Sequence, residues 1–283
     1  MGKPSFFQMS EQASEHILRY HVSLGCTPLP GDRLSAPFGS GIFAKFQLDG
    51  RTIYGILTAA HIARDLPLIF NQNRQFIGLT KPSQTEEALA CLVTFYLIYC
   101  SADIRYFNAA GRDAYRPDVA FIVLGIDKVP EHELICSSAF YDLDTNPEFL
   151  FEKDPQILSG FFRGACNLDE VSEDNFLYTP VCFGGGEEIS YDVEVAVQYW
   201  KIPNKSLETI AGGSGSGFWR FRYNEEGILV KSLAGVITGE GEDFIEAISF
   251  SYLIETFLPG LKAQVKDLLL EERAAAASIV PSK

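Results

Sequence analysis

Short segments in which apolar and polar residues alternate, separated by turn residues, dominate the chain from Gly41 onward. The clearest pair is 42–48 and 52–57, joined by Asp49-Gly50. Because Asp and Gly tolerate the backbone angles of a two-residue β-turn, this pattern predicts a hairpin. Many short strands divided by Gly and Asp turns favour an all-β barrel or sandwich. Further strands are expected at 92–99, 119–124, 189–200, 217–223 and 228–238.

The two ends of the chain differ from this pattern. Residues 9–21 predict a short amphipathic helix, and 251–257 and 261–276 predict helical segments near the C-terminus. Pro259-Gly260 lies between the last two and is expected to interrupt them, since proline breaks the helical hydrogen-bond ladder. The second C-terminal segment carries an apolar stripe made of Leu261, Val265, Leu268 and Leu269.

Length and charge limit the classes of protein to consider. The chain has 283 residues, of which 47% are hydrophobic, enough for one large domain or two small ones with a packed core. The net charge of −14 argues against a nucleic-acid binder, since contacts with phosphate need a basic face. The same charge favours the approach of basic segments of a protein substrate.

The N-terminal residues and the cysteines bear on the compartment. The first residues lack the apolar core of a signal peptide, and no apolar run is long enough to span a bilayer. The six cysteines include no Cys-x-x-Cys pair, and no His/Cys spacing is typical of a metal site. We therefore expect free thiols in a reduced, cytoplasmic protein, with no cofactor, no metal and no membrane partner.

Three polar residues, His61, Asp118 and Ser214, follow one another in the order of a serine peptidase. A serine hydroxyl becomes an effective nucleophile when a neutral imidazole accepts its proton. A carboxylate then fixes the imidazole tautomer and stabilises the imidazolium. Glycines surround Ser214 in 212–217, and they let backbone N–H groups approach a developing oxyanion. The three residue types together favour nucleophilic catalysis.

The chain resembles the trypsin/chymotrypsin-like serine peptidases. The family's Thr-Ala-Ala-His segment is matched by 58–61, and its aspartate before an apolar strand is matched by Asp118. Its Gly-x-Ser-Gly-Gly/Ser motif is matched by 212–216, and the resemblance extends over most of the chain, from Gly39 to Ile254. Bacterial intracellular peptidases of this type, some of them in stress or defence systems, are the nearest resemblance.

The resemblance implies a role for each residue of the site. Ser214 attacks the substrate, His61 acts as base and then as acid, and Asp118 orients His61. The backbone N–H groups of Gly212 and Ser214 form the oxyanion hole.

The resemblance also implies the architecture. The expected fold is all-β, with two packed six-stranded antiparallel β-barrels (chymotrypsin-like) and with N-terminal and C-terminal helices. Residues 1–38 would be an N-terminal helical extension, 39–257 the peptidase domain with its two barrels, and 258–283 a C-terminal helix and tail.

Each site residue has a competitor. Ser216 lies in the same motif, but Ser214 has Gly212 two positions before it, where the oxyanion-hole donor is expected. Asp113 is close to Asp118, but only Asp118 directly precedes an apolar run. The glycine-rich stretch around Ser214 also has the composition of a flexible linker, although no domain boundary flanks it.

Two departures from digestive trypsins concern activation. Gly213 stands where those enzymes carry an aspartate that pairs with a freed N-terminus, and no Ile-Val-Gly-Gly activation sequence precedes the first expected barrel. The resemblance therefore implies no trypsin-like zymogen cleavage, and we expect gating by a regulatory protein partner or a conformational change. Residues 1–38 and the C-terminal helices are the candidate docking segments.

The substrate pocket is assigned by the same resemblance. The floor of the pocket lies six positions before the nucleophile in the family, which is Glu208 here, and the strand with Thr238 forms a wall. A carboxylate at the floor favours an Arg or Lys side chain. A gap of one residue would instead place Leu207 or Thr209 there, with an apolar or small pocket.

Three functions fit these residues unequally. A serine endopeptidase acting on protein substrates uses all three site residues. A catalytically silent protein-binding module on a peptidase scaffold has no need of them. An esterase-like hydrolase would carry a Gly-x-Ser-x-Gly elbow followed by a helix, whereas 218–223 predicts a strand.

Overall fold

The computed structural model describes most of the N-terminal half of the chain and several separate segments of the rest. The described residues are 12–13, 16–25, 28–29, 33–34, 38–71, 74–81, 89–101, 104–107, 113–136, 138–145, 156–160, 181–184, 187–192, 197–201, 213–240 and 244–278.

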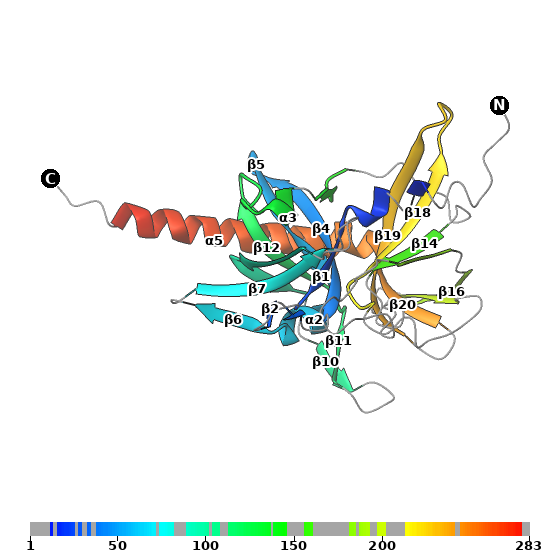
Figure 1. The fold of residues 1–283 in the computed structure, drawn as a ribbon, viewed down its shortest axis with the longest axis horizontal. Coiled ribbons are helices and arrows are strands. Elements are labelled where there is room, and N and C mark those ends of the chain that lie inside the picture. Colours follow the sequence, from blue (N-terminus) through cyan, green and yellow to red (C-terminus); the bar gives the residue numbers. More distant parts are fainter. Residues whose placement is uncertain are drawn as a thin grey trace.

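Most described residues belong to two large, mainly antiparallel sheets (Figure 1). The first sheet has nine strands. In spatial order they are β6 (Leu68–Asn71), β7 (Arg74–Lys81), β1 (His21–Leu24), β4 (Gly39–Leu48), β5 (Arg51–Thr58), β12 (Ala120–Ile126) and β9 (Leu97–Cys100), with β8 (Leu89–Thr94) beside β7 and β13 (Tyr141–Asp142) parallel to β4.

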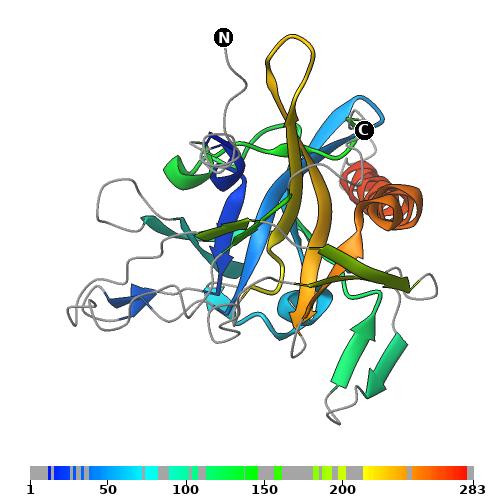
Figure 2. The same cartoon turned by 90° about the vertical axis from the view of Figure 1, so that its right-hand side faces the viewer.

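The second sheet has seven strands. In spatial order they are β15 (Val181–Gly184), β14 (Gln156–Gly160), β18 (Gly217–Tyr223), β19 (Leu229–Glu240), β20 (Phe244–Ser249), β17 (Val197–Lys201) and β16 (Glu187–Asp192). Two small sheets pair β2 (Pro28–Leu29) with β3 (Arg33–Leu34), and β10 (Ile104–Phe107) with β11 (Asp113–Arg116). Figure 2 shows the long β18–β19 hairpin rising away from the rest of the second sheet.

The mainly β class expected from the sequence is confirmed, but two six-stranded barrels are not seen among the described strands. The first sheet curls as a half-barrel. The hairpin expected over 42–57 is β4–β5, in which Leu48 pairs with Arg51 and Asp49-Gly50 forms the turn with positive φ at both residues.

Some expected strands are divided in the structure. The single strand expected over 92–99 is two strands, because β8 pairs with β7 while β9 pairs with β12. The strand expected over 189–200 is also two, β16 and β17, which pair with each other. Alternation of apolar residues cannot reveal such a break, since it continues on both sides of the turn.

Three short helical elements accompany the sheets. They are α2 (Ala60–Asp65), α3 (Glu133–Cys136) and α4 (Phe250–Tyr252). The helix expected over 9–21 does not reach its expected end, because β1 begins at His21 and joins the first sheet between β7 and β4. All four residues of β1 are buried, and their backbone groups pair with β4 and β7.

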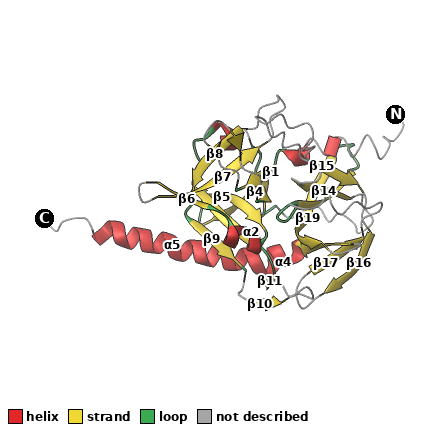
Figure 3. Ribbon diagram, turned by 60° about the horizontal axis from the view of Figure 1, so that its bottom comes forward, coloured by secondary structure: helices red, strands yellow, loops and turns green. Residues whose placement is uncertain are grey.

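The chain ends in one long helix that runs past the sheets (Figures 1 and 3). The π-helical turn η4 (Leu253–Phe257) leads directly into α5 (Leu258–Ser278). The interruption expected at Pro259-Gly260 is therefore wrong. The N–H of Leu258 bonds to the carbonyl of Leu253, five residues back, and this wider turn accommodates a proline ring that a regular α-helix would not. The apolar stripe of α5 faces the core: Leu261 and Val265 are fully buried.

Two hydrophobic clusters fill the interior. One lies within the first sheet and includes α2. The other joins both sheets to α5. In the second cluster Trp219 of β18 stacks on Tyr20 at 5.5 Å between ring centroids, and its Nε1 donates to His21 Nε2 at 3.3 Å. These contacts hold the start of β18 against the first sheet. In the described part of the chain, no helix is long and apolar enough to cross a bilayer.

Candidate active site

His61 lies at the first turn of α2, directly after the buried end of β5. Ala59 precedes this helix with extended backbone and offers no side-chain cap. The missing cap comes from another part of the chain, since the backbone N–H of His61 donates to Asp118 Oδ1 at 2.9 Å. A carboxylate at this position satisfies one of the free N–H groups of the helix start and meets the positive end of the helix dipole.

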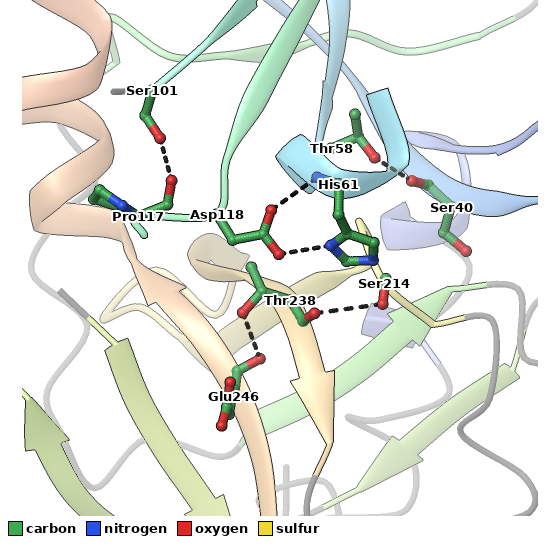
Figure 4. Close-up of polar contacts among 9 residues, drawn as sticks. All are labelled: Ser40, Thr58, His61, Ser101, Pro117, Asp118, Ser214, Thr238 and Glu246. Carbon is green, nitrogen blue, oxygen red and sulfur yellow. Dashed lines mark hydrogen bonds and ion pairs between the residues drawn. The ribbon is translucent and has the colours of Figure 1, made fainter. Parts of the chain in front are cut away.

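Asp118 also binds the His61 ring. Its Oδ2 is 2.6 Å from His61 Nδ1 (Figure 4), so the two carboxylate oxygens contact the same residue at its backbone and its side chain. This contact fixes the orientation of the imidazole. It favours the tautomer with the proton on Nδ1, which faces the carboxylate, and leaves Nε2 as the acceptor. The side chain of Asp118 is 14% exposed and that of His61 is 32% exposed, so the ring is open to a ligand while its partner is shielded.

Ser214 comes from the segment that leads into β18 of the second sheet. Its carbonyl accepts from the N–H of Ser40 at the start of β4, at 2.9 Å. Gly215 follows with a φ of +87° and donates to Ile237 O of β19 at 2.7 Å. A Cβ on Gly215 would lie 1.9 Å from Ser40 O and 2.3 Å from Thr58 Oγ1. Glycine is therefore required there both for its backbone angle and for the close approach of the first sheet.

The three residues meet where the two sheets face each other. Figure 4 shows the His61 imidazole with the Asp118 carboxylate on one side and Ser214 on the other. His61 lies in α2, and Asp118 lies two residues before β12 of the first sheet. Ser214 lies in the segment that leads into β18 of the second sheet. The structure thus brings together residues that are far apart along the chain.

The Ser214 hydroxyl is not bonded to its expected acceptor. It donates to the carbonyl of Thr238 at 3.5 Å. Among the described residues, Ser214 Oγ forms no hydrogen bond with the His61 ring. A bond of that length is weak. Rotation of the Ser214 side chain about Cα–Cβ is the change that would turn the hydroxyl toward Nε2.

The electrostatics of His61 follow from its neighbours. Burial alone would lower the pKa of His61, because it disfavours the charged ring. The hydrogen bond and the negative charge of Asp118, with a smaller effect from Asp65, outweigh burial, and the pKa of His61 lies above its usual value. The imidazolium that forms during proton transfer is therefore stabilised at this position.

Two residues expected at the site and two competitors fall outside or away from this geometry. Gly212 and Glu208 lie outside the described residues. Asp113 begins β11, in one of the small two-stranded sheets. Ser216 is completely buried, and its Oγ has no hydrogen-bond partner among the described residues. A buried hydroxyl cannot meet a substrate, so the accessible serine of the motif is Ser214.

Residues to which the sequence assigned no role of their own also support the site. The hydroxyl of Thr58 donates to Ser40 O at 2.7 Å and fixes the strand end that holds Ser214. Ser101 contacts the segment that carries Asp118. Neither serine is in a recognisable motif, and only the pairing of strands places them here. Across the described residues, no group of three or more His, Cys, Asp or Glu side chains could hold a metal ion.

No protein-family model matches the chain, and a search of curated proteins found no match either.

Proposed function

We propose that this chain is a serine endopeptidase of the trypsin-like type. One observation carries the proposal: Asp118 binds both the ring and the backbone of His61, and Ser214 lies on the other side of that ring. Ion pairs of histidine with a purely structural role are common. Such a pair would not require a serine bordered by glycines, brought from the opposite sheet, on the free side of the ring. The trypsin-like arrangement of two barrels is part of this proposal.

The proposed reaction uses these groups in sequence. As Ser214 Oγ forms a bond to the substrate carbonyl carbon, its proton passes to His61 Nε2, and Asp118 stabilises the resulting imidazolium. His61 then gives this proton to the leaving amine as the C–N bond breaks, and an acyl-enzyme remains. Water repeats the cycle: its proton goes to His61, its oxygen attacks the acyl carbon, and Ser214 leaves with the proton. The N–H groups of Gly212 and Ser214 are the proposed donors to the oxyanion.

Labelling with a fluorophosphonate probe tests this proposal. The wild-type protein should acquire one adduct, and Ser214→Ala should acquire none. Ser232→Ala serves as a control, since Ser232 is a buried serine of β19 that bonds to Leu233 O and Tyr141. A wild-type protein that folds and is not labelled at any probe concentration would overturn the assignment.

A second function has one observation in its favour. The Ser214 hydroxyl bonds to Thr238 O and not to His61, and a peptidase-fold module that only binds proteins would not need the Ser214–His61 bond. The same observation fits a peptidase that a regulatory partner must switch on, and we propose this gated form, acting on protein substrates in the cytoplasm. Labelling separates the two: a binding module stays unlabelled, while a gated enzyme is labelled slowly alone and faster with its partner.

We also propose a preference for Lys or Arg before the scissile bond. Glu208 lies outside the described residues, but the carboxylate of Glu246 lies close to the strand that is the proposed wall of the pocket. Glu246 Oε2 is 3.2 Å from the position that a Cβ on Gly239 would take, and Gly239 follows Thr238 in β19. Acidic groups beside a pocket wall favour basic side chains. A peptide-library profile should lose its basic preference in Glu208→Ala or Glu246→Gln. Enrichment of aliphatic or aromatic residues, unchanged in both variants, would contradict the proposal.

A further inference from the structure

Ser101 holds both neighbours of Asp118. It follows β9 and is 4% exposed. Its N–H donates to Val119 O at 2.9 Å, and its hydroxyl donates to Pro117 O. Val119 N–H also donates to Pro117 O at 3.1 Å, which closes a tight turn around Asp118. One buried serine therefore fixes the backbone on both sides of the carboxylate that binds His61 (Figure 4).

The C-terminal helical segment reaches the same serine from the other side. The Tyr252 hydroxyl of α4 lies close to Ser101, and the Tyr252 side chain packs on the same hydrophobic cluster as Tyr99 of β9. The next part of this segment packs on β9, since Phe257 contacts Tyr99 at 5.2 Å between ring centroids. At the start of α5, a Cβ on Gly260 would lie 2.3 Å from the Tyr99 hydroxyl. The helix thus approaches β9 as closely as a glycine allows.

From these contacts we infer that Ser101 is a positioning residue for Asp118, and that the C-terminal segment 250–278 acts on the site through Tyr252 and Ser101. The inference rests on the proposed function only for its effect on catalysis. The effect on the Asp118–His61 pair follows from the contacts alone.

Geometry explains why this support matters. Asp118 meets His61 with both oxygens at once, at 2.9 Å and 2.6 Å, and such a two-point contact tolerates little movement of the backbone that carries it. Without the Ser101 hydroxyl, the carbonyl of Pro117 loses a partner and the turn around Asp118 can open. The second contact partner of Asp118, the first turn of α2, stays in place because Ile62 and Ala63 are buried. The carboxylate would therefore move relative to a fixed helix α2, and its contact with the imidazole would weaken.

A shift of this kind has a readout that needs no activity. Burial lowers the pKa of His61, and only the contacts with Asp118 and, to a smaller extent, the charge of Asp65 raise it. Weaker contact with Asp118 therefore lowers the pKa of His61. A purely structural role of Ser101 would reduce the melting temperature without moving this pKa in the folded protein.

The test is an NMR titration of the His61 ring in the full chain, with the signal assigned by its loss in His61→Ala. Ser101→Ala should lower the His61 pKa, Tyr252→Phe should lower it less, and Ser232→Ala, a buried serine in β19, should leave it unchanged. If the proposed peptidase activity is present, Ser101→Ala should reduce kcat by about tenfold with little change in KM.

The outcomes separate the inference from the proposed function. A folded Ser101→Ala protein whose His61 pKa equals that of the wild type overturns the role of Ser101. If Ser101→Ala does not fold, Tyr252→Phe decides, and an unchanged pKa there overturns the link to the C-terminal segment. An unlabelled wild-type protein in the fluorophosphonate experiment counts against the peptidase and leaves the titration result standing.

Discussion

At the scale of single residues, the site depends on a few side chains that each make two contacts. Asp118 caps α2 and orients the His61 ring, so one carboxylate links a helix start to the candidate catalytic side chain. The four-residue match at 58–61 includes Thr58 for a separate reason, since its hydroxyl holds Ser40 beside the Ser214 turn. The segment 58–61 thus contains both the candidate base, His61, and a residue that holds the neighbouring backbone in place, Thr58.

The first prediction distinguishes the two serines of the motif. Ser214→Ala should lower turnover by about three orders of magnitude or more, as deletion of a nucleophile does. Ser216→Ala should keep most of the activity, because the Ser216 hydroxyl is buried and has no described partner. Mass spectrometry of the inhibited protein locates the adduct, and an adduct on Ser216 would refute the assignment.

The second prediction concerns pH. The base form of His61 is neutral, and the pKa of His61 lies above its ordinary value of about 6.5. As the pH is lowered, kcat/KM should therefore decrease with a midpoint above that ordinary value. In Asp118→Asn the raising contacts are lost and burial remains, so this midpoint should move to lower pH, while the plateau rate falls by about a thousandfold or more. A midpoint that stays in place in Asp118→Asn would show that another group titrates.

The same shift has a consequence for stability, with the opposite direction in pH. Because the folded protein holds the His61 proton more tightly than the unfolded chain, the protonated pair stabilises the fold. This contribution is complete below the unfolded pKa of about 6.5 and is lost as pH rises through the higher folded pKa. The conditions that favour catalysis are thus those in which this stabilisation is absent.

At the scale of elements, the important joint is the turn from Ser214 into β18. It bonds to β4 through Ser40 and to β19 through Ile237, so both sheets fix it. Gly215 allows this close contact. The π-helical turn before α5 is a second important connection, because the helix continues through Pro259 without a break.

The third prediction tests the first joint with a matched pair of glycines. Gly215 and Gly227 both have positive φ, at +87° and +76°, but a Cβ on Gly227 meets nothing within 4 Å. Gly227→Ala should cost about 1 kcal/mol in the free energy of unfolding, from backbone strain alone. Gly215→Ala should cost about 1–3 kcal/mol more, because the added methyl group collides with Ser40 O. Chemical denaturation measures both, and equal costs would argue against the tight contact.

At the scale of the whole molecule, the site lies between two sheets that are held together by Trp219, Tyr20 and the C-terminal segment. The net charge of −14 makes the molecule as a whole negative, which under the proposed function would favour basic substrates. The long helix α5 leaves the body of the protein, with Leu270 52% exposed beyond its buried turns.

The fourth prediction concerns the six cysteines. Cys91, Cys100 and Cys136 are free thiols in the structure, and the other three are expected to be reduced as well. Burial raises the pKa of Cys91 to about 12, so this thiol should react only after unfolding. Alkylation under denaturing, non-reducing conditions should count six thiols by intact mass. Two or more stable disulfides would contradict the cytoplasmic assignment.

The sequence by itself determined the local features of this protein. Asp49-Gly50 specifies its hairpin, the 217–223 pattern specifies β18, and the stripe from Leu261 to Leu269 specifies which face of α5 is buried. Each rests on neighbours in the chain, within which periodicity and turn chemistry act. The identities of His61, Asp118 and Ser214 as candidates belong here too, because each has a distinctive local context.

Only the tertiary structure decided how these pieces meet. The passage of the C-terminal helix through Pro259 depends on the wide turn closed by Leu258 and Leu253, which the residue pattern does not reveal. The division of 92–99 into two strands and the place of β1 in the first sheet depend on partners that are distant in the chain. The roles of Ser101 and Ser40 depend on them as well, since a lone serine carries no pattern that local sequence can reveal. Hydrogen bonding and packing between remote segments select these features. A local pattern of residues along the chain does not reveal such contacts.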